Sequence, residues 1–146
     1  TLSLLSETCA ERRISVEMTP PPADKSVLAD YRHIKTCFLN VFLNAIQAMP
    51  EGGRLTVESV PANGFVTVLV RDTGCGISPE NIVRVFDPYF TTKDIGIGIG
   101  LALTKRVIEE HGGSISIVSA LNKGAAVYIS LPVSVGLAPA CLPSCA

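Results

Sequence analysis

Hydrophobic and polar positions repeat with two different periods along the chain, and each period predicts one type of element. A spacing of three to four residues predicts three helices, over residues 2–12, 30–49 and 100–111. Strict alternation predicts five strands, over residues 14–18, 54–60, 65–72, 114–120 and 125–131. A further, shorter helix is indicated after Ser78, which can cap it, with Pro79 in the first helical position and an end near Phe86.

Turn residues separate these elements where each pattern stops. Asn63-Gly64 joins two of the strands, and glycine pairs at 52–53 and 112–113 end two of the helices. Strands mixed with helices in this order predict an α+β fold, a two-layer sandwich in which helices cover one face of a mostly antiparallel, mixed sheet. No internal repeat or linker divides the chain, so we expect one domain and a frayed tail over residues 134–146.

The composition narrows the classes of protein that fit. The 146 residues are 47% hydrophobic and 17% charged, with a net charge of −1, which favours a compact core and disfavours disorder or a nucleic-acid partner. No apolar run approaches the ~20 residues that cross a bilayer, so we expect no membrane contact by this domain. The five cysteines form an odd, scattered set typical of reduced thiols in a cytoplasmic protein.

Three alternate glycines, Gly96, Gly98 and Gly100, precede the last helical pattern. Because they lack Cβ atoms, their backbone N–H groups can approach a ligand, and the following helix would direct its positive end to the same place. This combination indicates a phosphate site, although glycine clusters also form ordinary turns. The sequence contains no P-loop motif, and the glycine spacing does not match a dinucleotide-binding unit.

Two further groups of polar residues interrupt apolar patterns. Asn40 and Asn44 lie one turn apart on one helix face, where they either meet solvent or present amide oxygens to a hydrated Mg²⁺. Asp72 continues the inward face of its strand, so its carboxylate needs a donor such as an adenine amino group, unless it simply begins an acidic turn. Gly74 and Gly76 would let the base lie against the backbone.

An aromatic cluster of Phe86, Tyr89 and Phe90 lies in a segment without a regular pattern. It either closes one side of the core or forms a partly apolar surface for a partner domain. The polar residues 91–93 follow directly and are placed to reach phosphate oxygens, although threonine and lysine are also ordinary in exposed loops.

Taken in order, these motifs resemble those of the ATP-binding catalytic domain of sensor histidine kinases, in the superfamily shared with gyrase, Hsp90 and MutL. Residues 40–48 resemble the N box, 72–77 the first glycine box, 85–93 the F box and 96–103 the second glycine box. The resemblance covers residues 1–133, which we expect to form the catalytic domain, and it implies a Bergerat-type ATP-binding fold.

The resemblance implies ATP and Mg²⁺ as ligands and assigns a role to each motif. Asn44 would bind Mg²⁺ with help from Asn40, and Asp72 would accept from the adenine amino group. Asn40 and Lys93 would act in catalysis, and residues 91–96 would form a short lid. The implied nucleotide contacts are Asn40, Asn44, Gln47, Asp72, Gly74, Gly76, Ile77, Thr91, Thr92, Lys93, Gly96, Gly98, Gly100 and Leu101.

Asn40 separates subfamilies, because the hydrolysing relatives usually place a glutamate base there and asparagine cannot accept a proton. The resemblance therefore implies transfer of the γ-phosphoryl to a histidine. Residues 1–146 contain no phosphoacceptor motif, so this histidine would lie on a separate dimerisation domain, with a response regulator downstream and a membrane anchor allowed elsewhere in the full-length kinase. Two departures, Ile97 and Ala125, replace residues that commonly carry hydroxyls and motivate an alternative, a degenerate nucleotide-binding or partner-docking module. ATP hydrolysis is a third, less favoured alternative.

Overall fold

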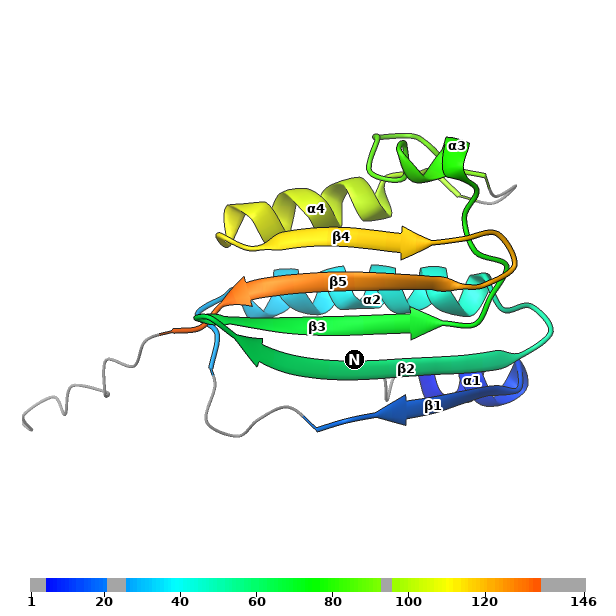
Figure 1. Cartoon of the computed structure of the whole chain (residues 1–146), viewed down its shortest axis with the longest axis horizontal. Helices are drawn as coiled ribbons and strands as arrows, with labels where there is room; N and C mark the ends of the chain where they lie inside the picture. Colours follow the sequence, from blue (N-terminus) through cyan, green and yellow to red (C-terminus); the bar gives the residue numbers. More distant parts are fainter. Residues whose placement is uncertain (1–4, 21–25, 93–95, 135–146) are drawn as a thin grey trace, which may run out of the picture.

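The computed structural model describes residues 5–20, 26–92 and 96–134. Its elements follow in the order α1 (Ser6–Glu11), β1 (Ile14–Met18), α2 (Tyr31–Gln47), β2 (Gly53–Ala62), β3 (Phe65–Asp72), α3 (Pro79–Ile82), α4 (Gly100–Glu110), β4 (Ser114–Ser119) and β5 (Ala125–Pro132). The strands form one sheet, and α2 and α4 pack together on one of its faces (Figure 1). This two-layer α+β arrangement confirms the predicted fold class.

The sheet is mixed and mostly antiparallel. Its strand order is β1-β2-β3-β5-β4, in which β1 runs parallel to β2 and every other neighbouring pair is antiparallel. β3 is the central strand, with Leu55 of β2 opposite Asp72 and Val127 of β5 opposite Val70. Asp72 therefore ends a strand that has a neighbour on each side, away from the edges of the sheet.

Local signals set the ends of the helices. The Asp30 carboxylate accepts from the backbone N–H of Arg32 at 2.8 Å, which caps α2 as predicted. α3 is shorter than expected, because it ends at Ile82 instead of near Phe86. Backbone bonds spanning three residues follow it, so residues 83–86 form turns rather than further α-helix. None of the described helices is long and apolar enough to cross a membrane.

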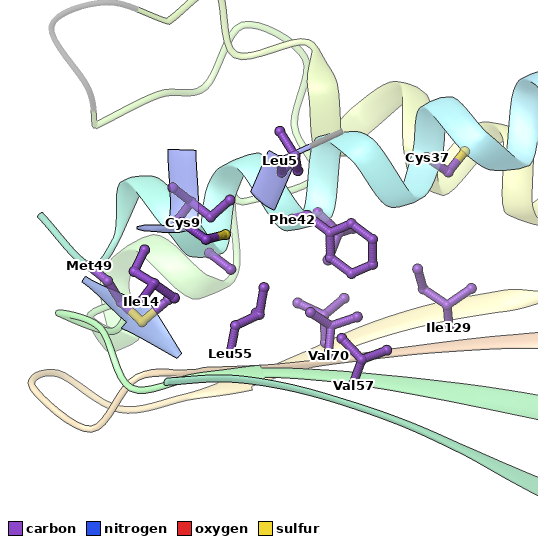
Figure 2. Close-up of a cluster of buried hydrophobic side chains, with 14 of the residues drawn as sticks. Leu5, Cys9, Ile14, Cys37, Phe42, Met49, Leu55, Val57, Val70 and Ile129 are labelled. Atoms are coloured by element: carbon purple, nitrogen blue, oxygen red, sulfur yellow. The ribbon is translucent and has the colours of Figure 1, made fainter. Parts of the chain in front are cut away.

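The hydrophobic core lies between the sheet and the helices. Phe42 points from α2 toward the sheet, where Leu55 and Val70 point back toward the helix (Figure 2). α4 adds the fully buried Ile108, and β1 adds Ile14 near the end of the core that α1 covers. Burying each such apolar side chain stabilises the fold by roughly 1.5–3 kcal/mol. The core therefore fixes the positions of α2 and α4 relative to β3.

Candidate functional site

A cavity of about 780 Å³ opens between α2, the end of β3 and the segment that leads into α4. Most of the predicted site residues line it, namely Asn40, Asn44, Gln47, Asp72, Gly76, Ile77, Thr91, Thr92, Gly96, Gly98, Gly100 and Leu101. Gly74 is not part of this lining, and Lys93 lies outside the described residues. The volume is in the range of sites that bind small molecules.

Asp72 is buried, with 6% of its surface exposed, on the same face of β3 as Val70. Its Oδ1 accepts from the backbone N–H groups of Gly74 at 2.8 Å and Ala125 at 3.3 Å. Burial raises the pKa of this carboxyl group, and the two backbone donors oppose that shift. Both of these hydrogen bonds involve Oδ1, and Asp72 also lines the cavity.

The two glycines that follow β3 are required by close backbone contacts. A side chain on Gly74 would overlap the carbonyl oxygen of Ala48 at the end of α2. One on Gly76, whose φ is +67°, would overlap the carbonyl oxygen of Ala120 after β4. The loop after β3 therefore packs between the end of α2 and the segment after β4. The absence of a side chain at Gly74 makes room for protein backbone rather than for a ligand.

The N-terminus of α4 meets the cavity without a side-chain cap. Ile99 occupies the N-cap position and provides no side-chain hydrogen bond, while Gly100 and Leu101 line the cavity. The first backbone N–H groups of a helix have no partner within the helix, and they carry the positive end of its dipole. This end of α4 is therefore suited to an anion such as a phosphate group.

Asn40 connects α2 to the first turn of α4. Its Nδ2 donates to the Gly100 carbonyl at 3.3 Å and to Thr104 Oγ1 at 3.4 Å, and the threonine hydroxyl donates to the same carbonyl at 2.8 Å. Thr104 is fully buried, so this network stabilises the contact between the two helices. Asn44 lies one turn further along α2 and is half-buried. Both asparagines lie in the cavity wall rather than on the solvated flank of the helix.

The aromatic cluster before α4 lies at the surface, and none of its three rings belongs to the hydrophobic core. Tyr89 is 74% exposed, and Phe90 is half-buried beneath the guanidinium of Arg84, which lies 4.5 Å from the ring centroid. The Tyr89 N–H donates to the Gly98 carbonyl at 3.0 Å. This bond joins the two ends of the loop that precedes α4.

Several lining residues were not predicted, namely Cys75, Ser78, Asn81, Val85, Leu121 and Ala125. Leu121 is an exposed apolar residue in the turn between β4 and β5, and nothing in its local pattern places it beside this cavity. The positions of Ser78 and Asn81 could have been predicted to lie together, because residues three apart at the start of a short helix share a face.

Comparison with known sequences identifies the family to which the chain is similar. Residues 29–135 match the family described as histidine kinase-, DNA gyrase B-, and HSP90-like ATPases. The sensor histidine kinase ZraS of Salmonella typhi is 40% identical over 133 residues, which cover 90% of this chain and 29% of that kinase. Sporulation kinase D of Bacillus subtilis is 43% identical over 102 residues, which cover 70% of this chain and 20% of that protein. The chain thus spans less than a third of the length of these curated relatives.

Solved structures give the same result. The catalytic domain of histidine kinase ThkA superposes with a TM-score of 0.79 at 32% identity, covering 89% of this chain and 86% of that one. Full-length ShkA in complex with AMPPNP superposes with a TM-score of 0.82 at 27% identity, covering 94% of this chain and 29% of that one. The chain therefore belongs to the family of histidine kinase-, DNA gyrase B-, and HSP90-like ATPases, and within it to the ATP-binding catalytic domains of sensor histidine kinases.

Proposed function

We propose that this chain binds Mg-ATP in the cavity and donates the γ-phosphoryl group to a histidine on a separate dimerisation domain of a two-component sensor kinase. One observation carries the proposal. A single cavity holds both the buried Asp72 carboxylate and the uncapped N-terminus of α4. An acceptor for a base and a helix end for phosphates together suit a nucleotide. The relatives support it, since they are sensor kinases and one neighbour was solved with AMPPNP.

At the base end of the cavity, the second oxygen of Asp72 accepts a hydrogen bond from the 6-amino group of adenine. The carboxylate is buried, so a ligand that lacks this donor leaves an acceptor unpaired. Gly76 and Ile77 form one wall of the base pocket. This contact selects adenine over a purine without the amino group.

At the phosphate end, the backbone N–H groups of Gly98, Gly100 and Leu101 bind phosphate oxygens, with residues 91–93 contributing side-chain contacts. None of the described lining residues is a lysine or an arginine. The negative charge of the triphosphate is therefore met by backbone donors and by the dipole of α4, together with Lys93 and Mg²⁺.

Mg²⁺ fits the donor set at this end of the cavity. The described residues form no cluster of three or more His, Cys, Asp or Glu side chains that could hold a metal ion by themselves. A hydrated ion that shares substrate phosphates needs few protein ligands, and amide oxygens suit it. We assign Asn44 as the ligand, with Asn40 assisting. The bound ion supplies charge neutralisation of the phosphates.

Transfer then depends on positioning, because Asn40 carries no basic group and its Nδ2 is engaged with the Gly100 carbonyl. A nitrogen of the acceptor histidine attacks the γ-phosphorus, a P–N bond forms as the P–O bond to ADP breaks, and ADP leaves. Water competes poorly without a general base. In this proposal the domain covers residues 1–133, residues 134–146 form a tail, and the domain lies in the cytoplasm with a response regulator as the next acceptor.

Calorimetric titration with Mg-ATP tests the base contact. Asp72→Asn preserves the size of the side chain but offers an amide N–H₂ where the adenine amino group needs an acceptor, so we expect ATP affinity to fall by about 100-fold. Glu58→Gln makes the same chemical change at an exposed position of β2 and serves as the control. Equal affinities of Asp72→Asn and the wild type would refute the assignment.

Incubation with γ-labelled ATP and a supplied histidine-bearing acceptor domain tests transfer. Label on the acceptor is the expected result. ATP binding without labelling would identify a degenerate module, and release of phosphate in the absence of an acceptor would identify a hydrolase. Either of these results would overturn the proposed reaction.

A further inference from the structure

Ser119, the last residue of β4, makes two hydrogen bonds with its single hydroxyl group. The Oγ atom accepts from the backbone N–H of Ile77 at 2.9 Å and donates to the carbonyl of Gly124 at 2.7 Å. The side chain is half-buried and does not line the cavity. Its two partners lie on separate segments, one after β3 and one before β5, so the hydroxyl joins two loops that are distant in the sequence.

Both partners of Ser119 are adjacent to the base end of the cavity. Ile77 lines the cavity itself. Gly124, with φ at +75°, lies so close to the Asp72 carbonyl that no side chain fits there. The next residue, Ala125, lines the cavity and donates its N–H to Asp72 Oδ1 at 3.3 Å. A shift of the segment before β5 would therefore change the bonding of the carboxylate.

We propose that Ser119 is a positioning residue for recognition of the base: its hydroxyl fixes the turn between β4 and β5 against the loop after β3 and thereby orients the Asp72 carboxylate toward the 6-amino group of a purine. The inference rests on the proposed function, since it concerns the same nucleotide site. It assigns a role to a residue that contacts no ligand and acts through Gly124 and Ala125.

A second link between the two loops allows the role to be tested without unfolding the site. The backbone N–H of Asn122 donates to the Cys75 carbonyl at 2.7 Å, and this bond does not involve the side chain at position 119. Ser119→Ala then leaves the Ile77 N–H and the Gly124 carbonyl without their partner while the turn stays attached. The expected result is a folded domain in which the Asp72 carboxylate is held less firmly.

The experiment compares two ligands in four proteins. Dissociation constants are measured for ATP and for purine riboside triphosphate, which differs from ATP only by lacking the 6-amino group. The proteins are the wild type, Ser119→Ala, Ser119→Thr and Ser116→Ala. Ser116 lies on the same strand but on its other, exposed face, so its variant is a matched control. Thermal denaturation of each variant records stability separately.

In the wild type, ATP is expected to bind more tightly than the analogue. Ser119→Ala is expected to lower ATP affinity about tenfold, the size of one ordinary hydrogen bond, with little change for the analogue. Ser119→Thr, which retains a hydroxyl, and Ser116→Ala are expected to keep the wild-type ratio. A wild-type ratio in Ser119→Ala, even with a lower melting temperature, would overturn this inference alone. Failure of the wild type to bind ATP would overturn the proposed function as well.

Discussion

The base end of the cavity and its phosphate end differ in what their backbone donors are bonded to. At the base end, the backbone donors form hydrogen bonds within the protein. Gly74 and Ala125 donate to the Asp72 carboxylate, and Ile77 donates to the Ser119 hydroxyl. At the phosphate end, α4 begins without a side-chain cap. At the first end these backbone donors are engaged before a ligand arrives, whereas the second end has donors that an anion can engage.

This difference indicates that the two ends of the cavity meet two different requirements, a preformed pocket for the base and available donors for the phosphate charge. A preformed base pocket does not have to be ordered when the ligand binds, which favours affinity and selectivity. Unengaged donors at the other end are suited to charge that arrives with the substrate. Substitutions at the base end should therefore change stability and affinity together, while substitutions at the phosphate end should change affinity with a smaller effect on stability.

The sharpest comparison replaces one glycine at each end by alanine. Gly124 and Gly98 have φ values of +75° and +70°, and a side chain on either would overlap neighbouring backbone. The neighbour of Gly124 is the end of the central strand, whereas the neighbour of Gly98 is the loop before α4. We expect urea denaturation to show a loss of at least about 3 kcal/mol for Gly124→Ala and about 1–2 kcal/mol for Gly98→Ala. Equal losses would remove the distinction between the two ends.

A second substitution examines the point where the phosphate end is attached to α2. Asn40→Asp keeps the shape of the side chain but removes the donor to the Gly100 carbonyl and Thr104, and it adds a negative charge near the phosphates. The free energy of unfolding should fall by about 1–3 kcal/mol, and ATP affinity should fall too. Gln47→Glu makes the same chemical change at an exposed lining position and should also lower ATP affinity, because it adds a negative charge to the cavity wall. Unchanged stability of Asn40→Asp would show that the network does not connect the helices.

The pH dependence of the free energy of unfolding tests the effect of the Asp72 charge at the base end. Because burial raises the pKa of Asp72 in the folded state, the folded protein holds this proton more tightly than the unfolded chain does. Asp72 therefore makes its whole contribution to stability at pH values below the ordinary aspartate pKa of about 3.9. This contribution is lost as the pH rises through the raised pKa of the folded state. Asp72→Asn should match the wild type at low pH and exceed its stability at neutral pH. Denaturation curves across this range would contradict the prediction if the variant were less stable at neutral pH.

The smallest effect is expected at the surface of the loop before α4. Arg84→Gln removes the cation above the Phe90 ring and an exposed ion pair with Asp87. Exposed interactions of this kind contribute less than about 1 kcal/mol. Global stability should barely change, while proteolysis near Thr91 and Thr92 should accelerate, because the loop before them is held less firmly. Limited digestion followed by mass spectrometry measures this, and an unchanged cleavage rate would show that Arg84 does not restrain the loop.

Much of the fold could be predicted because its signals are local. The helical spacing around Asn40 and the alternation that ends at Asp72 each arise within one element, and both place the residue on a particular face. The burial of Asp72 and its two backbone donors are consistent with the expectation that it continues the inward face of β3. The cap at Asp30 was predictable for the same reason.

Other features depend on segments that meet only in the folded chain. The sequence around Gly74 does not reveal that its missing side chain makes room for Ala48. Ser119 resembles any serine at a strand end until the turn after it packs against the loop after β3. The short extent of α3 likewise depends on a competition between turn and helix bonds that Ser78 and Pro79 do not decide.

The parallel pairing of β1 with β2 has a practical consequence for where the folding unit begins. Ile14 to Met18 pair with Gly53 to Val57, yet the segment that matches the family begins only at residue 29. A recombinant product started at residue 29 would strip this strand from β2 and uncover a row of backbone groups that can pair with another molecule. It would also remove Cys9 and Ile14 from the interior. Aggregation of such a truncated product would therefore reflect the uncovered edge of β2.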